Sequence, residues 1–106
     1  MTQCLVYMTA ASEDEALRLG RTLVEERLAA CVNILGPIRS IFRWEGTLQE
    51  ETEIAFLAKT DEARVDALTE RVTALHSYEC PCVVALPIQA GAPDFLAWIS
   101  CQTALS

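Results

Sequence analysis

Hydrophobic residues recur along this chain with two spacings, one typical of strands and the other of helices. Residues 4–9 form a short run of apolar, β-branched and aromatic side chains, which favours a strand. Ser12 and Glu15 then have the spacing of a capping box, and apolar residues recur at helical spacing over residues 16–28. The pattern predicts a strand followed by a helix that packs one apolar stripe on a sheet.

The longest predicted element is an antiparallel hairpin over residues 26–60, with a glycine-bearing turn at residues 44–46. Each arm holds about a dozen residues, roughly 40 Å if extended, whereas the usual strand has about five or six. Gly36 and Pro37 interrupt the first arm. Because proline cannot donate to a ladder and glycine permits a bulge, we expect a bend or an edge there. We infer that something outside the chain covers part of this hairpin.

A second helix, a strand and a third helix complete the predicted order. Thr60 or Asp61 caps the second helix, which ends near His76. Residues 82–88 are typical of a buried strand, and Pro93 suits the first turn of a short terminal helix. The order βαββαβ plus a C-terminal helix predicts one α+β domain of all 106 residues, with a ferredoxin-like antiparallel sheet and two helices on one face.

The second face of this predicted sheet has no helix of the βαββαβ unit to cover it. Residues 54–58 are apolar at every position, so both faces of the third strand are apolar. Exposed patches of this kind usually mark a protein interface, and we therefore expect an oligomer. The alternative is an unusually hydrophobic monomer that is partly covered by the C-terminal helix.

Composition narrows the range of possible binding partners and cellular compartments. The formal net charge is -7, and the eight basic residues are scattered among fifteen acids, which argues against nucleic acid and suits a cation. No apolar run approaches membrane-spanning length and the N-terminus lacks the basic start of a signal peptide, so we expect a cytoplasmic protein with no membrane partner. The five cysteines are an odd set, expected to be reduced thiols or small buried residues.

Local residues argue against three familiar users of this fold and against catalysis. Residues 9–12 lack the Cys-x-x-Cys of a metallochaperone, the predicted strands lack the aromatic and basic surface of an RNA-binding module, and no anion-binding loop with arginine follows the first strand. One histidine and no nucleophile elbow provide no catalytic constellation. We therefore expect that the protein is not an enzyme and that it has no catalytic residue.

Two of the three candidate metal ligands, His76 and Cys82, lie after the second helix, and the third, Met8, ends the first strand. His76 is the only histidine, and Cys80, Pro81 and Cys82 follow it; imidazole and thiolate are ligand types for copper or zinc. Met8 offers a soft thioether. The alternative is that the helix dipole stabilises His76 and that Met8 fills the core.

A second candidate site lies on the hairpin. Glu53 and Lys59 share one face of the predicted third strand, and Trp44 lies near the turn. These side chains can line a small pocket between chains, since pockets favour aromatic walls with a few polar groups. The alternative is solvated charges at the strand ends and a packed tryptophan.

At the hairpin the sequence resembles the CutA family of divalent-cation tolerance proteins. The resemblance covers nearly the whole chain and is carried by an ordered set of short motifs: Glu26-Arg27-Leu28-Ala29-Ala30-Cys31-Val32-Asn33, Trp44-Glu45-Gly46, Glu53, Lys59-Thr60, His76-x-Tyr78-x-x-Pro81 and Asp94-Phe95-Leu96-Ala97-Trp98-Ile99.

This resemblance implies an interlocked homotrimer of ferredoxin-like protomers that takes part in the response to metal ions and binds copper or a related divalent ion. It places Cys31, Trp44, Glu53, Lys59 and Tyr78 in inter-subunit clefts and implies no enzymatic activity. The alternative is a trimeric signalling or scaffold module that binds a small molecule or a partner protein in those clefts.

The chain departs from the family pattern at three positions. It has Cys82 where the family commonly has glutamate after the proline, Leu75-His76 where some members have two histidines, and Met8 where cysteine occurs. A ligand set of His76 with Cys82 or Met8 favours cuprous over cupric ion, since thiolate and thioether select Cu(I).

Overall fold

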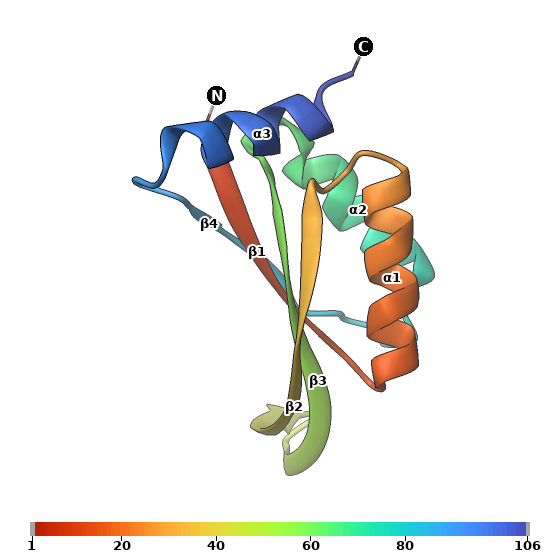
Figure 1. Ribbon diagram of the computed structural model, residues 1–106. Coiled ribbons are helices and arrows are strands. Elements are labelled where there is room, and N and C mark those ends of the chain that lie inside the picture. Colours follow the sequence, from red (N-terminus) through yellow and green to blue (C-terminus); the bar gives the residue numbers. More distant parts are fainter. Residues whose placement is uncertain (1, 106) are drawn as a thin grey trace.

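The fold is built on a four-stranded antiparallel sheet with strand order β2-β3-β1-β4. The computed structural model describes residues 2–105 (Figure 1). The elements in chain order are β1 (Gln3–Ala10), α1 (Glu13–Glu25), β2 (Cys31–Trp44), β3 (Thr47–Asp61), the 3-10 helix η1 (Glu62–Arg64), α2 (Val65–Leu75), β4 (Val83–Pro87) and α3 (Pro93–Thr103). The predicted ferredoxin-like order is confirmed.

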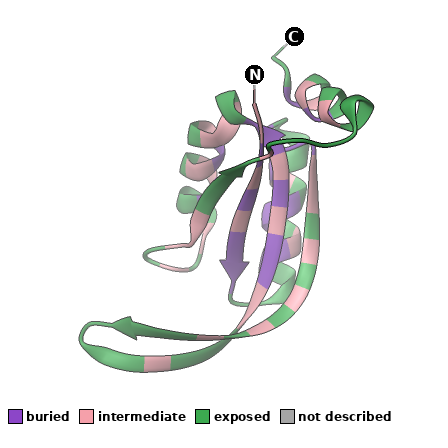
Figure 2. Cartoon of the chain, turned by 90° about the vertical axis from the view of Figure 1, so that its left-hand side faces the viewer, coloured by how far each residue is buried: buried purple, intermediate pink, exposed green. Residues whose placement is uncertain are grey.

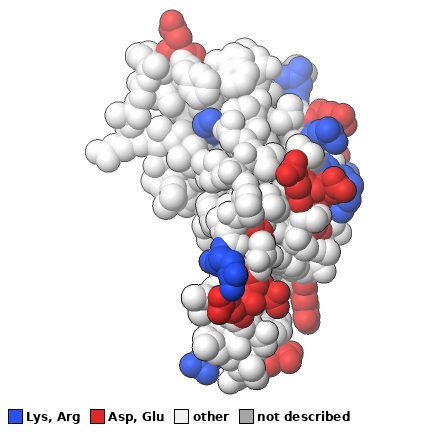
Figure 3. Space-filling model, turned by 60° about the horizontal axis from the view of Figure 1, so that its bottom comes forward, with Lys and Arg blue, Asp and Glu red and all other residues white. Residues whose placement is uncertain are grey.

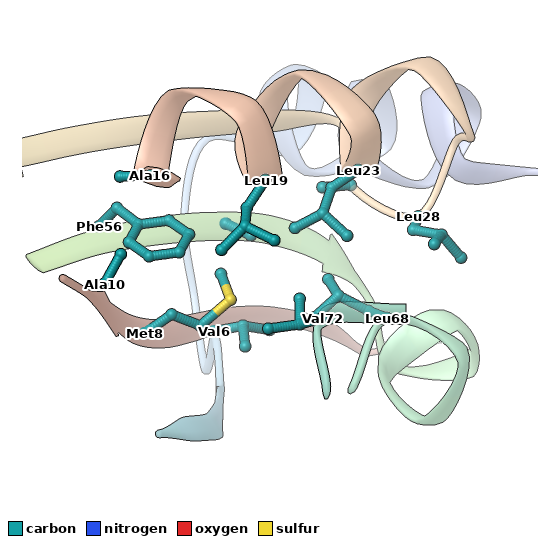
Figure 4. Close-up of a cluster of buried hydrophobic side chains, with 12 residues drawn as sticks. Val6, Met8, Ala10, Ala16, Leu19, Leu23, Leu28, Phe56, Leu68 and Val72 are labelled. Atoms are coloured by element: carbon teal, nitrogen blue, oxygen red, sulfur yellow. The ribbon is translucent and has the colours of Figure 1, made fainter. Parts of the chain in front are cut away.

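One hydrophobic core lies between the sheet and the pair of helices α1 and α2. Val6 and Met8 of β1 and Phe56 of β3 point toward the two helices and have no exposed surface. Leu19 of α1 and Leu68 of α2 meet them from the opposite side (Figure 4). Side chains alternate across a strand, so the odd-numbered residues of β1 and β3 face away from this core.

The third helix covers one end of the second sheet face. Ser100 of α3 accepts a hydrogen bond from Gln3 Nε2 (2.9 Å) and donates one to Asp61 Oδ2 (2.8 Å). The Lys59 ammonium lies 5.7 Å from the centre of the Phe95 ring. The rest of this face stays open within the chain. No helix among residues 2–105 is long and apolar enough to cross a membrane.

The hairpin begins later than predicted because residues 26–30 end α1. Arg27 has φ 58°, and the amide of Leu28 donates to the carbonyl of Leu23 at 2.9 Å, while that of Arg27 donates to Val24 at 3.1 Å. These bonds form a Schellman motif, which satisfies carbonyls that the helix end leaves without partners. The prediction that the first arm starts at Glu26 is therefore wrong, and β2 starts at Cys31.

The predicted interruption and turn of the hairpin are confirmed. The register of β2 against β3 shifts between Ile34 and Gly36, which has φ 119°, so Leu35 is an extra residue in the ladder. At the tip, Glu45 and Gly46 both have positive φ, as a two-residue type I′ turn requires. Beyond the bulge the hairpin extends away from the core, and its residues are exposed or half-buried (Figure 2).

The fourth strand differs from its prediction as a buried strand. It is shorter, and Val84 and Leu86 are 51% and 58% exposed. The reason is its position at the sheet edge, where it pairs only with β1 and turns these two side chains onto the open face. Only Val83 packs against the core.

Thr60 provides a test of this architecture. Asp61, not Thr60, caps η1, whereas the fully buried Thr60 hydroxyl donates to the carbonyl of Leu28 at 2.7 Å. We expect Thr60→Val to lower the free energy of unfolding by about 1–3 kcal/mol, because the carbonyl keeps its burial and loses its donor. Urea unfolding measures this change. The control, Thr52→Val on the exposed hairpin, should change stability by less than about 0.5 kcal/mol, and an equally small change in Thr60→Val would contradict the assignment.

Candidate functional site

A buried carboxylate anchors the segment that follows α2. Glu15 accepts hydrogen bonds from the amide of Ala11 (3.0 Å) and from the amide and hydroxyl of Ser77 (2.9 and 3.0 Å). Only 4% of Glu15 is exposed. Burial alone would raise the pKa of this carboxyl, but the hydrogen bonds from Ala11 and Ser77 and the nearby His76 lower it below its ordinary value. The N-terminus of α1 thus fixes the position of residues 76–78.

His76 uses both ring nitrogens in this anchor. Nε2 lies 2.8 Å from the carbonyl oxygen of Thr9, which can only accept, so Nε2 carries the proton and donates. Nδ1 accepts from the amide of Tyr78 at 3.0 Å. The side chain has no exposed surface. The only imidazole of the chain is therefore enclosed and occupied, and it positions Tyr78.

Tyr78 connects the anchored segment to the hairpin. Its hydroxyl donates to Glu53 Oε1 at 3.0 Å, and its ring lies 4.6 Å from that of His76. Burial and the Glu53 carboxylate both raise the pKa of this phenol, so it stays protonated and continues to donate. The bond joins β3 to the segment before β4.

The hairpin, β1 and residues 78–82 line a hollow of about 870 Å³ that is open to solvent, on the open face of the sheet. Aromatic walls come from Tyr7, Phe42, Trp44 and Tyr78. Its polar lining includes the carboxylates Glu51, Glu53 and Glu79 and the thiols Cys80 and Cys82. The hollow therefore combines apolar surface with anionic and soft ligand groups. A cation fits this donor set better than an anion.

The two thiols differ in environment. Cys80 is exposed, whereas Cys82 is half-buried, and burial and the Glu53 carboxylate raise the pKa of the Cys82 thiol. All five cysteines of the chain are free.

The structure separates the three predicted metal ligands. Cys82 lines the hollow, His76 is enclosed, and Met8 is fully buried on the core side of the sheet. Among residues 2–105, no three His, Cys, Asp or Glu side chains lie close enough together to hold a metal ion. A closed site with three or more protein ligands would therefore need donors from outside the described part of this chain.

The residues expected in the clefts fall into two groups. Trp44, Glu53 and Tyr78 line the hollow. Cys31 pairs with Lys59 near the other end of β3, where Lys59 donates to Asn33 Oδ1 at 2.7 Å. Glu53 and Lys59 are six positions apart along β3, about 20 Å, so the two charges do not meet within one chain.

Sequence reasoning missed several residues that line the hollow. Tyr7, Phe42, Glu51 and Glu79 were not predicted as site residues, and they meet only when β1, the hairpin and the segment before β4 come together.

Sequence reasoning also missed one role of Glu15. The spacing of Ser12 and Glu15 indicated a helix cap, which is confirmed by the 3.1 Å bond from the Glu15 amide to Ser12 Oγ. The second role of Glu15, as acceptor for Ser77, joins residues 62 positions apart and leaves no local signal.

Comparison with known proteins decides the family. The family model described as CutA1 divalent ion tolerance protein matches residues 4–102. This chain belongs to the CutA1 family. The Divalent-cation tolerance protein CutA of Archaeoglobus fulgidus is 46% identical over 94 residues, which cover 89% of this chain and 91% of the relative. Protein CutA homolog of Xenopus laevis is 44% identical over 93 residues, and this chain spans only 62% of its length.

Solved CutA1 structures share the fold over the whole chain. The crystal structure of CutA1 from Oryza sativa has a TM-score of 0.95 at 40% identity, covering 100% of this chain and 97% of that one. The structure of the Archaeoglobus fulgidus protein, which is described as periplasmic, has a TM-score of 0.93 at 42% identity and covers 96% of this chain and 99% of that one.

The anchor at Glu15 predicts a specific pH dependence. A carboxyl whose pKa is depressed on folding contributes stability that is present above its unfolded pKa and is lost as the pH falls through the folded value. We expect Glu15→Gln to lose about 1–3 kcal/mol at pH 7, with a difference from wild type that shrinks in acid. Urea unfolding between pH 7 and about pH 3 measures this difference.

The matched control is Glu13→Gln, an exposed residue in the same first turn of α1. It should follow wild type within about 0.5 kcal/mol at every pH. A constant Glu15→Gln deficit across the whole pH range would contradict the assignment of a depressed pKa.

Proposed function

We propose that this chain is a divalent-cation tolerance protein that acts as a homotrimer and binds copper or a related ion in the hollow. The observation that carries the proposal is the lining of the hollow, which gathers carboxylates and thiols beside aromatic walls in a member of the CutA1 family. The role that we propose is binding rather than catalysis, and it is supported by the single imidazole, whose two nitrogens are both used in bonds to backbone groups.

The open face of the sheet supports the proposed assembly. Leu5, Tyr7, Leu57, Val84 and Leu86 lie on this face, in two rows across β4, β1 and β3. Leu86 is 58% exposed on this face. Ile41 and Leu48, on the side of the hairpin that faces away from the hollow, are 68% and 67% exposed and add a second apolar surface. Apolar surface of this extent usually marks an interface. In Figure 3 few charged side chains interrupt the upper left surface, whereas acids and bases gather along one side and toward the bottom of the view.

Assembly into a trimer also accounts for the number of ligands that a metal ion needs. A divalent ion such as Zn²⁺ takes four ligands in closed protein sites, more than the described residues of one chain bring together. In the proposed trimer a neighbouring copy completes the ligand set at the hollow. Copper bound in the hollow is coordinated by carboxylate and thiol groups of this chain. It is bound there and takes part in no reaction.

A second candidate function rests on the size and the walls of the hollow. A volume of about 870 Å³ with four aromatic side chains is typical of a site for a small organic molecule. In this alternative the trimer is a signalling or scaffold module, and a small molecule or a partner peptide occupies the hollow. A ligand screen by thermal shift tests it, because a molecule that binds only the native state raises the melting temperature.

We place the protein in the cytoplasm, as a proposal supported by its thiols. Cys80 and Cys101 are exposed and free, and free exposed thiols persist in reducing compartments.

The assembly predicts a change in mass when the open face is charged. We expect the wild type to sediment as a trimer and Leu86→Lys to sediment as a monomer, because a buried lysine at an apolar interface lacks a partner. Analytical ultracentrifugation measures the mass. Val24→Lys is the control, since Val24 is 41% exposed on α1, away from the open face. A monomeric wild type, or a trimeric Leu86→Lys, would refute the proposed interface.

The ion proposal predicts that the hollow carboxylates bind a divalent ion. We expect the double variant Glu53→Gln, Glu79→Gln to bind Cu(II) at least about tenfold more weakly than wild type, a loss of about 1.4 kcal/mol. Glutamine at position 53 keeps an oxygen that accepts from Tyr78, so the hollow should keep its shape. Equilibrium dialysis against a competing chelator gives the dissociation constants. The control Glu70→Gln, at an exposed position on α2, should bind Cu(II) as wild type does. Equal binding by wild type, the double variant and this control would contradict the proposal.

A further inference from the structure

Two cysteines separated by one proline line the hollow. Cys80 and Cys82 are both free, and both contribute to its wall, together with Glu53 and Glu79. Residues two positions apart can have Cα atoms at most about 7 Å apart. The chain therefore places the two cysteines beside one another on one surface, and their χ1 rotamers set the distance between the sulfur atoms.

The segment that carries the thiols is anchored immediately before them. Ser77 is bonded to Glu15, the amide of Tyr78 donates to His76, and the Tyr78 hydroxyl donates to Glu53. Pro81 fixes its own φ near −65° and restricts Cys80 to extended conformations. The backbone of this segment is therefore already ordered before an ion binds, which reduces the entropic cost of binding.

The chemistry and spacing of this pair match a soft ion with two ligands. Thiolates select soft ions such as Cu(I). Metal–thiolate bonds are about 2.3 Å long, so two sulfurs on opposite sides of an ion lie about 4.6 Å apart. Side chains from Cα atoms about 7 Å apart can meet that separation. A two-coordinate ion needs only the two thiolates, whereas a tetrahedral ion would need two further ligands, and no group of three or more such ligands is found among residues 2–105.

We propose that Cys80 and Cys82 form a dithiolate site for a soft, two-coordinate monovalent cation, with Cu(I) and Ag(I) as the probes that fit it. Each thiol releases its proton to water and donates a sulfur electron pair to the ion, so two protons leave, no electron is transferred and no oxidant is needed. The inference rests on the proposed function only in taking the hollow as the cation site. It differs in needing neither a neighbouring copy nor the carboxylates.

The surrounding carboxylates shape the conditions for binding. Glu53 and Glu79 favour a cation in the hollow because their carboxylates line it beside the two thiols. Since a thiol must lose its proton to become a ligand, affinity should fall as the pH falls.

The test titrates the reduced full chain with Ag(I), and anaerobically with Cu(I) against a chromophoric chelator. We expect one ion per chain, ultraviolet thiolate-to-metal charge-transfer absorption, and release of about two protons per ion. Cys80→Ser and Cys82→Ser should each bind at least about tenfold more weakly, because a hydroxyl is a poor ligand for a soft ion. Cys101→Ser, which removes an exposed thiol on α3 outside the hollow, should bind as wild type does.

Two further arms keep the outcomes separate. Thermal unfolding of each serine variant confirms that the fold is retained, so that a loss of binding reports on the site itself. The variant Glu53→Gln, Glu79→Gln should keep Cu(I) binding within about tenfold of wild type while it loses Cu(II).

Loss of Cu(II) binding with intact Cu(I) binding in that variant supports both proposals. Wild type that binds Cu(I) and not Cu(II) overturns the divalent proposal alone. A folded variant with both Cys80→Ser and Cys82→Ser that binds Cu(I) or Ag(I) as tightly as wild type overturns the dithiolate site alone.

Discussion

The buried carboxylate of Glu15 is the constraint on which the site depends. It is held at the N-terminus of α1, and its bonds to Ser77 draw the segment after α2 toward the end of β1. From this anchor a chain of contacts runs through His76 and Tyr78 to Glu53 on β3. A charged group without partners would be costly in such a place, but each bond here stabilises the ionised form. The position of the hollow relative to the helices thus follows from one carboxylate.

Much of the fold could be predicted from the sequence because its signals are local. The cap at Ser12, the bulge at Gly36 and the start of α3 at Pro93 each follow from the conformational preference of a few adjacent residues. The boundary at Glu26 could not be predicted in this way. Arg27 adopts a left-handed conformation that usually favours glycine, so nothing in the local sequence marked the end of α1.

The site was less predictable than the fold because its contacts are distant in sequence. Trp44, Glu53 and Tyr78 line one hollow, whereas Cys31 and Lys59, which were expected with them in the clefts, lie near the other end of β3. His76 was expected as a ligand from its residue type, but ligand type does not reveal whether the ring nitrogens are already bonded to the backbone. Met8 and Cys82 lie near each other in the sheet register yet on opposite faces, since Met8 pairs with Val83 and not with Cys82. One residue of register decides between core and hollow.

The bulge at Leu35 has a similar effect on the whole hairpin. Before it, Val32 and Ile34 pair with Ala58 and Phe56 and face the core. After it, Ile38 pairs with Glu53, and the even-numbered side chains from Ile38 to Trp44 turn to the hollow. The extra residue thus changes which face of the sheet the even-numbered side chains of β2 occupy. In the first half of β2 they face the core, and in the second half they face the hollow. An insertion or deletion of a single residue there would exchange the two sides of distal β2 relative to β3, while leaving every amino acid of the hollow present in the chain.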